Sequence, residues 1–427
     1  MPALKTTDRP PHLSSSWIGK CLAFWLGGVF SIRLMSSLKS HDNSEGILYL
    51  VLLVIAIIWP LLYFIGSKHK FKPTKIRTGS LIAICIFFLF SILSSFASPT
   101  PFTSLAFIGL TIASTLISLQ FLSNIDSRQL EGGMKLYALL MGIILLLFTL
   151  YDYAPGERLG EGKKILNPNS IAMVAFSASL AAMAFRNIIL RYVIFSELFI
   201  IIYLTGSRGS AAGAMLGLAA ITLMRMQGSK ISTKAAFLLI MALVLTSGLY
   251  FWDVIGPIID DFLDLNTRDR GITSGASGRI YAWMETIKLF EDNPLFGVGF
   301  RAHEKLLSVG SSSHNGYLAM LAEIGLIGFL AVIYLVLSGV FMLWRKSKLP
   351  EYKHAHSILF GISIGYVFLA FFERFLINVG NPTSLLFLLG ILSPVLYQEK
   401  TQKKQKRLFL DATRANTQAQ IRVTKTV

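Results

Sequence analysis

The sequence predicts an all-α integral membrane protein with about twelve transmembrane helices and a small helical cap outside the membrane. Of the 427 residues, 53% are hydrophobic and only 15% are charged, and the mean hydropathy is +0.61. Soluble domains carry roughly 25% charged residues, so this composition excludes a soluble protein with a large core. Apolar windows near the roughly 20 residues that one crossing needs recur along the whole chain.

Twelve such windows mark the expected helices and divide the chain into three parts. The windows are 17–35, 47–66, 79–98, 102–122, 134–152, 169–186, 191–206, 209–226, 233–252, 316–344, 355–378 and 382–398. The parts are an N-terminal tail (1–16) without a signal-cleavage site, a polytopic membrane domain (17–398) and a basic C-terminal tail (399–427). A large loop at about 253–313 contains IYAWMETIKLF (280–290), whose apolar residues have helical spacing.

The positive charge is distributed unevenly between the two ends of the expected helices. The net charge is +17, which in a soluble protein would suggest a nucleic-acid partner. Here 27 of the 40 Lys and Arg residues lie in the two tails, in the loops expected on the same side of the membrane as the tails, or at the helix ends next to them. Cytoplasmic loops of polytopic proteins are enriched in these residues. Both termini are therefore expected in the cytoplasm, with membrane lipids rather than nucleic acid as surroundings. The C-terminal tail is either a topology anchor or a site for anionic lipids or a partner.

The tenth window begins with SSSHNG and is the longest. Residues 314–344 contain no evident helix breaker, so a continuous helix would be about 46 Å long, against about 30 Å of hydrocarbon. We expect Gly325–Trp344 to lie in the bilayer and the preceding turns to stand at the outer face. Ser311–Ser313 are candidate N-caps, and His314 lies outside the membrane.

Four arginines lie in short outer stretches, where the charge rule leaves them unexplained. They are Arg158 in GERLGEG, Arg208 in TGSRGSAAG, Arg270 in RDRG and Arg279 in SGRIYAW. A guanidinium matches phosphate oxygens, and flanking glycines with a following helix N-terminus would add backbone N–H donors. The alternative for Arg208 is an interfacial side chain that contacts lipid phosphate.

His314 also allows two interpretations. A histidine at a helix start is commonly a hydrogen-bonded cap element, and a neutral imidazole on the wet side can act as a general base. Gly325 and Gly328 would let another helix pack closely. Glu373 and Arg374, near the outer end of the eleventh window, are expected to support the same outer region.

The remaining polar candidates favour structural roles. Asp260, Asp261 and Asp264 could hold a divalent ion, but their spacing also gives the polar face of an interfacial helix. Cys21 and Cys85 lie in apolar segments without CxxC spacing, so we expect free buried thiols rather than a disulfide or a metal site.

Together these residues resemble the O-antigen ligase and polymerase superfamily of bacterial envelope enzymes. His314 and Asn315, followed after nine residues by Gly325 and after two more by Gly328, reproduce that family's His-Asn-x9-Gly-x-x-Gly pattern. The segments SRG (207–209), SGRIYAW (277–283) and NPN (167–169) are similar to its arginine-bearing and outer-loop elements. The resemblance covers most of the chain and implies a helical fold similar to the GT-C class of lipid-linked-sugar glycosyltransferases.

The resemblance implies glycan transfer at the periplasmic side of the bacterial inner membrane. The donor would be a glycan on undecaprenyl diphosphate, and the acceptor a sugar hydroxyl of lipid A–core. His314 would act as the base, while Arg208 and Arg279 would stabilise the leaving diphosphate. Substrate contacts are expected from Arg158, Asn167, Asn169, Arg270, Tyr281 and Asn315. The donor is already activated and no outer loop carries a nucleotide fingerprint, so no cofactor is expected. The arginines would make a metal unnecessary.

Two alternatives remain open. A polymerase of the same superfamily would use the same donor and transfer it to another glycan repeat. A lipid or sugar transporter is favoured only by Glu197, an ionisable residue inside the seventh window. The repeats and midplane polar residues typical of transporters are absent from the sequence pattern.

Overall fold

The computed structural model describes residues 17–38, 45–66, 75–161, 166–227, 279–308, 312–374 and 376–397, with a few isolated positions between 229 and 256. Arg270, the Asp260–Asp264 group and both tails lie outside the described residues, as does the ninth window (233–252) apart from two isolated positions.

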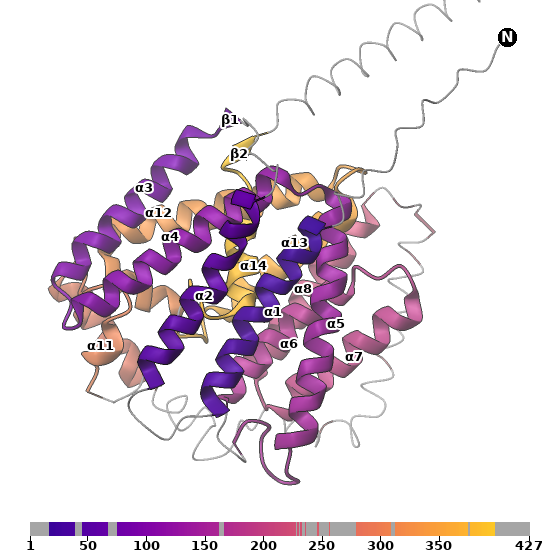
Figure 1. The fold of residues 1–427 in the computed structure, drawn as a ribbon, viewed down its shortest axis with the longest axis horizontal. Coiled ribbons are helices and arrows are strands. Elements are labelled where there is room, and N and C mark those ends of the chain that lie inside the picture. Colours follow the sequence, from indigo (N-terminus) through magenta and orange to yellow (C-terminus); the bar gives the residue numbers. More distant parts are fainter. Residues whose placement is uncertain are drawn as a thin grey trace, which may run out of the picture.

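The described chain is a bundle of α-helices (Figure 1). In chain order these are α1 (Trp17–Leu38), α2 (Glu45–Gly66), α3 (Thr78–Phe96), α4 (Pro101–Asn124), α5 (Ser127–Asp152), α6 (Pro168–Ala182), α7 (Ile188–Leu204), α8 (Arg208–Met226), α11 (Arg279–Asp292), α12 (Gly316–Ser347), α13 (Lys353–Leu369) and α14 (Pro382–Ile391). A short 3-10 turn, η3 (His303–Lys305), precedes α12. The two-residue strands β1 (Lys75–Ile76) and β2 (Leu396–Tyr397) pair in antiparallel fashion.

The helical membrane architecture expected from the sequence is confirmed. Five helices, α3, α4, α5, α8 and α12, are long and apolar enough to cross a membrane, and shorter apolar segments occur in α1, α2, α6 and α14. The chain is therefore a multi-pass helical membrane protein. The count of twelve crossings stays a prediction.

The centre of the bundle is formed by α6 and α14. Every residue of α14 is buried, as is the run Ile171–Ala182 of α6. A helix that is enclosed by other helices needs no polar face, which explains the uniformly apolar pattern along α14. The Ser177 hydroxyl lies 2.8 Å from the Tyr137 hydroxyl and 2.7 Å from the Thr383 hydroxyl, and so joins α5, α6 and α14.

The expectation of an uninterrupted tenth helix is wrong. Within α12, Gly325 has φ 68° and ψ −179°, a conformation that interrupts the helix. The broken ends bond to the loop after α11, since the Val298 N–H donates to the Ala322 carbonyl (2.9 Å) and the Leu326 N–H donates to the Pro294 carbonyl (2.8 Å). Buried backbone groups need such partners, so the inserted loop is what makes the break stable.

Three smaller expectations also need correction. The N-cap of α12 is Asn315 rather than a serine, because its side-chain oxygen accepts from the N–H groups of Tyr317 and Leu318. Helix α13 ends at Leu369 instead of continuing to residue 378, so Glu373 lies beyond the helix. Both cysteines are free as expected, but only Cys21 is buried, while Cys85 is exposed on the surface of the bundle.

Candidate active site

His314 lies in a short segment that joins the cap to α12. Its backbone is left-handed (φ 46°), an uncommon conformation for a residue with a side chain. Two contacts fix the helix that follows: the Gly316 N–H donates to the Ala370 carbonyl (2.8 Å) and the Tyr317 hydroxyl donates to the Val367 carbonyl (2.8 Å). The C-terminal end of α13 therefore determines where the imidazole stands.

Helix α11 approaches the same segment from the other side. The Trp283 indole N–H donates to the Ser313 carbonyl (2.7 Å), directly before His314. Arg279 is the first residue of α11 and lies close enough to influence the charge of the imidazole. The helix expected at 280–290 is confirmed, and it brings these two predicted site residues together.

Burial and neighbouring cations keep the His314 imidazole neutral. Burial first, then the charges of Arg279 and Arg374, lower the pKa of His314 from 6.5 to about 4. The Glu304 carboxylate opposes this shift, and His303 adds to it. A neutral imidazole can accept a proton at neutral pH, although its basicity in this state is low.

Arg374 and Glu304 form a two-point ion pair next to His314. The Arg374 Nε donates to one Glu304 carboxylate oxygen at 2.7 Å, and a terminal nitrogen of the same guanidinium contacts the other oxygen. The pair connects the segment after α13 with η3. The supporting role expected for Arg374 therefore has a specific partner that the sequence did not indicate.

Beneath this pair lies a second, fully buried contact that sequence reasoning missed. His303 Nδ1 lies 2.6 Å from the Glu323 carboxylate, and the two side chains are 0% and 2% exposed. Glu323 immediately precedes the break in α12, and its carbonyl accepts from the Gly299 N–H (3.1 Å). The signal in the sequence was an acidic residue inside the apolar run LAMLAEIGLIGF.

Arg208 begins α8, whose N-terminal end packs on the C-terminal end of α13. A Cβ on Gly209 would stand 3.3 Å from Leu369 and 3.5 Å from Phe372. Further along, Gly213 and Gly365 meet so closely that a Cβ on either would contact the backbone of the other. Small residues four apart permit this approach, and it brings half-buried Arg208 to the end of α13 that also holds the start of α12.

Arg158 is held against the turn that precedes α8. Its Nε donates to the Thr205 carbonyl (2.8 Å), its Nη1 pairs with Glu161 (2.8 Å), and the side chain covers Gly206. Gly206 is in the left-handed region at φ 61° and leaves room for this guanidinium. Arg158, through its side chain, and Arg208, as the first residue of α8, thus meet at the same turn.

Two of the other predicted contact residues are helix caps. Asn167 caps α6, with its side-chain oxygen accepting from the Asn169 N–H (2.9 Å), and Asn315 caps α12. Both asparagines therefore have local structural roles, and their substrate roles stay predictions. Tyr281 is 62% exposed on α11.

Two further sequence features have structural explanations. Glu197, the ionisable residue inside the seventh window, faces Gly142 of α5, and the Arg191 guanidinium at the start of the same helix donates to the Phe185 carbonyl (2.8 Å). Of the two candidate close-packing glycines, Gly328 faces Phe90 of α3, whereas Gly325 faces the backbone of Leu295. Within the described residues, no group of three or more His, Cys, Asp or Glu side chains could hold a metal ion.

Comparison with known proteins agrees with this architecture. A family model described as O-Antigen ligase matches residues 192–333, a range that contains Arg208, Arg279 and His314. The exopolysaccharide production protein ExoQ of Rhizobium meliloti (strain 1021) is 27% identical over 328 residues, which cover 69% of this chain and 72% of the relative. Both similarities support a place for this chain in the O-antigen ligase/polymerase superfamily, whose members are glycosyltransferase-like enzymes of polysaccharide synthesis.

Proposed function

We propose that this protein is an O-antigen ligase. It transfers a glycan from undecaprenyl diphosphate to a sugar hydroxyl of lipid A–core, at the periplasmic face of the inner membrane and with inversion at the anomeric carbon. Both termini would be cytoplasmic, with twelve crossings arranged as in GT-C-like enzymes. The observation that carries the proposal is the half-buried, neutral His314 with cationic Arg279 and Arg374 beside it.

The chemistry follows from these neighbours. As the acceptor hydroxyl attacks the anomeric carbon, its proton passes to a neutral His314, and the bond between that carbon and the diphosphate oxygen breaks. General base catalysis of this kind contributes about 10²–10⁴-fold. Negative charge develops on the leaving diphosphate, and guanidinium groups fixed in advance lower the barrier. We assign this role to Arg208 and Arg279, with Arg158 as a further donor contact.

The low pKa of His314 suggests that the substrate itself activates the base. Arg279 and Arg374 are among the causes that hold this pKa down. A bound diphosphate would offset their positive charge and add negative charge nearby, and both effects favour the imidazolium. Donor binding would therefore raise the pKa of His314 towards neutrality, where a general base is most effective.

The decisive experiment is the lipopolysaccharide banding pattern of the source bacterium carrying His314→Ala, with the membrane abundance of the variant measured in parallel. Core without attached glycan, together with accumulated undecaprenyl-linked polymer, is the expected result. An unchanged ladder at normal abundance would remove His314 from the mechanism and return the transporter to consideration. Arg279→Ala should also lose transfer, whereas Lys288→Ala, an exposed cation on the same helix, should retain it.

A second candidate is transfer of the same donor to another glycan repeat, as in a polymerase. The observation that favours it is the relative whose name refers to exopolysaccharide production, since a free polysaccharide grows by glycan-to-glycan transfer. In the experiment above, core carrying a single repeat would identify this activity. Either reaction should persist in excess EDTA, and a loss of activity that one added metal ion restores would contradict the metal-free mechanism.

A further inference from the structure

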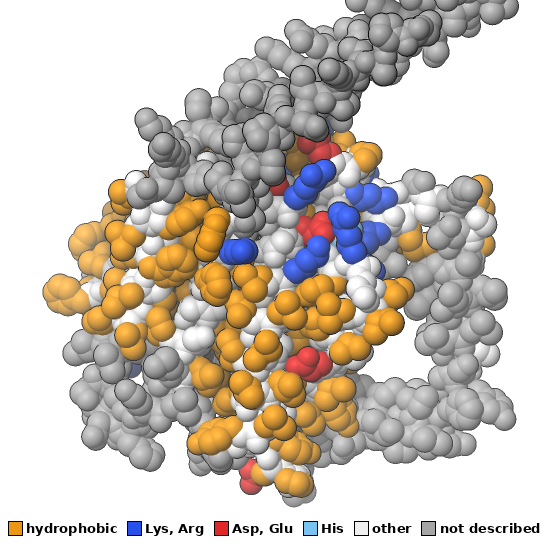
Figure 2. Space-filling view, turned by 45° about the vertical axis from the view of Figure 1, so that its right-hand side comes forward, with side chains coloured by type: hydrophobic (Ala, Val, Ile, Leu, Met, Phe, Trp, Pro, Cys, Tyr) orange, Lys and Arg blue, Asp and Glu red, His pale blue; other side chains and the backbone are white. Residues whose placement is uncertain are grey.

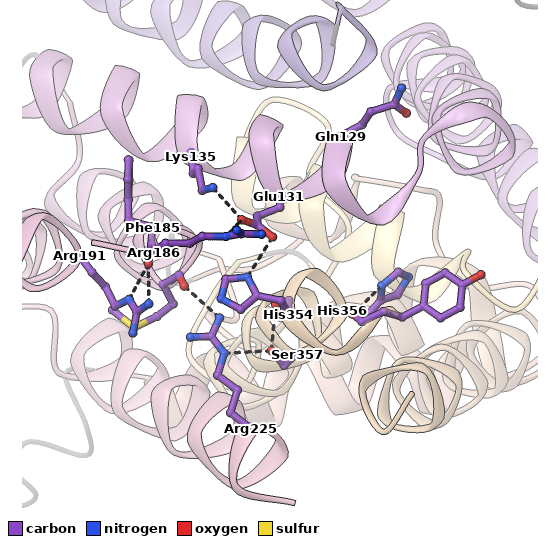
Figure 3. A network of polar contacts seen from close by, with 12 residues as sticks. Gln129, Glu131, Lys135, Phe185, Arg186, Arg191, Arg225, His354, His356 and Ser357 are labelled. Atoms are coloured by element: carbon purple, nitrogen blue, oxygen red, sulfur yellow. Dashed lines mark hydrogen bonds and ion pairs between the residues drawn. The ribbon is translucent and has the colours of Figure 1, made fainter. Parts of the chain in front are cut away.

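A cluster of basic side chains lies at the end of the bundle opposite His314. It consists of Lys135, Arg186, Arg191, Arg225 and His354 around the single carboxylate of Glu131, and we call it the basic cluster (Figure 3). The Glu131 oxygens lie 2.7 Å from Lys135 Nζ, 3.1 Å from His354 Nδ1 and 3.7 Å from Arg186 Nε. Figure 2 shows Lys and Arg side chains gathered at this end, above a broad hydrophobic surface.

Two of the arginines are fixed in place by backbone carbonyls. Arg191 donates through two nitrogens to the Phe185 carbonyl, and Arg225 donates to the Met183 carbonyl (2.9 Å). A guanidinium has five N–H donors, so these contacts orient each group while using only part of its capacity. Arg191 also lies within electrostatic reach of Arg225, a like-charged neighbour.

The charge of the basic cluster is unbalanced. Among the described residues of the basic cluster, Lys135 and three arginines are accompanied by one carboxylate, that of Glu131, and the Arg186 side chain is 83% exposed. Like charges held close together destabilise a fold unless an anion lies between or beside them. The fixed geometry and the exposed Arg186 therefore favour an external anion at this position.

An apolar groove begins beside the basic cluster and runs between α5 and α7. Its volume is about 770 Å³, and its lining includes Leu146, Ile188, Ile189, Tyr192 and Ile200. Ile188 and Ile189 are 62% and 72% exposed at the start of α7. Tyr192 lines the groove and also lies within electrostatic reach of Arg225, so the groove and the basic cluster adjoin.

We propose that the basic cluster and this groove bind one anionic phospholipid. The phosphodiester would lie against Arg186, Lys135 and the free donors of Arg191, and an acyl chain would follow α7 along the groove. The charge distribution of the chain predicts that this end faces the cytoplasm, where anionic lipids attract basic segments. A soluble anion would use the charges but not the adjoining apolar groove, which is why a lipid is the better occupant.

The test is native mass spectrometry of the purified full-length chain, titrated with phosphatidylglycerol and phosphatidylcholine of identical acyl chains. The wild type should prefer phosphatidylglycerol by about fivefold or more. Arg186→Gln should weaken phosphatidylglycerol binding by about fivefold, as expected for one charge near a membrane surface, and leave phosphatidylcholine unchanged. Lys348→Gln, at the same end but above the Trp344 ring, is the matched control and should bind as the wild type does.

The groove is tested separately. Ile200→Trp should weaken both lipids because it fills the groove, whereas Leu216→Trp, on an exposed position of α8, should not. Equal binding of the two lipids by the wild type, or an Arg186→Gln variant that binds phosphatidylglycerol normally, would overturn the proposal. Inorganic phosphate that competes as well as the lipid does would assign the basic cluster to a soluble anion and also overturn it. Because the readout is lipid binding, the result is independent of glycan transfer.

Discussion

Gly325→Ala should disrupt both the fold and the site, because the added methyl group is unfavourable for the backbone conformation and also overlaps neighbouring atoms. Gly325 has φ 68° and ψ −179°, a backbone region that is essentially restricted to glycine. The added Cβ would also stand 2.2 Å from the Leu295 carbonyl oxygen and 2.8 Å from the Phe296 nitrogen. These are backbone atoms of the inserted loop, so the overlap cannot be relieved by rotating a side chain.

The expected magnitude follows from these two costs. The backbone conformation costs about 1–3 kcal/mol for a residue with a side chain, and forcing extra volume into a packed site costs about 1–3 kcal/mol. Together they predict a loss of about 2–6 kcal/mol. Relief would require α12 to straighten or the loop to withdraw, and either movement would separate His303 and Glu304 from His314.

The assay is thermal unfolding of purified variants in detergent, followed by glycan transfer with the fraction that remains folded. Gly109→Ala in α4 is the matched control, because its Cβ would meet nothing within 4 Å. Gly297→Ala should resemble Gly325→Ala, since its φ is 74° and its Cβ would lie 2.4 Å from the Glu323 carbonyl. If Gly325→Ala unfolds at the same temperature as Gly109→Ala, then α12 is continuous and the reasoning is refuted.

Three further predictions concern the side chains around the candidate site. The pKa of His314 is about 4 in the folded chain and near 6.5 in the unfolded chain, so the unfolded chain binds more protons between these two pH values. The free energy of unfolding should therefore fall by up to about 3 kcal/mol as the pH drops from 6.5 to 4. His314→Gln should remove this pH dependence in unfolding measurements. Glu304→Gln removes the charge that raises the pKa of His314 and the partner of Arg374, so the acid limb of kcat/KM should move to lower pH; an unmoved limb would contradict the assignment of His314 as the base. Glu323→Ala removes the carboxylate that lies 2.6 Å from the buried His303 Nδ1 and should cost about 1–3 kcal/mol, whereas Glu323→Gln, which keeps one oxygen, should cost less than half as much. Unfolding temperatures equal to that of the wild type for both variants would show that the contact contributes little.

Several features of this protein were determined by local sequence. Hydropathy located the apolar helices of the described bundle, because a run of about 20 apolar residues can be recognised without knowing which residues it will contact. The expected orientation came from the uneven distribution of Lys and Arg, which can also be counted along the chain without knowledge of tertiary contacts. The spacing of His314, Asn315, Gly325 and Gly328 indicated the family, and the helix that carries Arg279 was evident from its own periodicity.

Tertiary structure decided the rest, because the responsible contacts join residues that are distant in the chain. The break at Gly325 is stable only through bonds from the Pro294–Gly299 loop, so the run of residues around it looks like an ordinary helix. The pairing of His303 with Glu323 depends on the same inserted loop. Arg208 and His314 are more than one hundred residues apart, and both lie near the C-terminal end of α13 because the starts of α8 and α12 pack there. A helix pattern records which residues are apolar, but the partner that each polar group finds is set by how the helices pack.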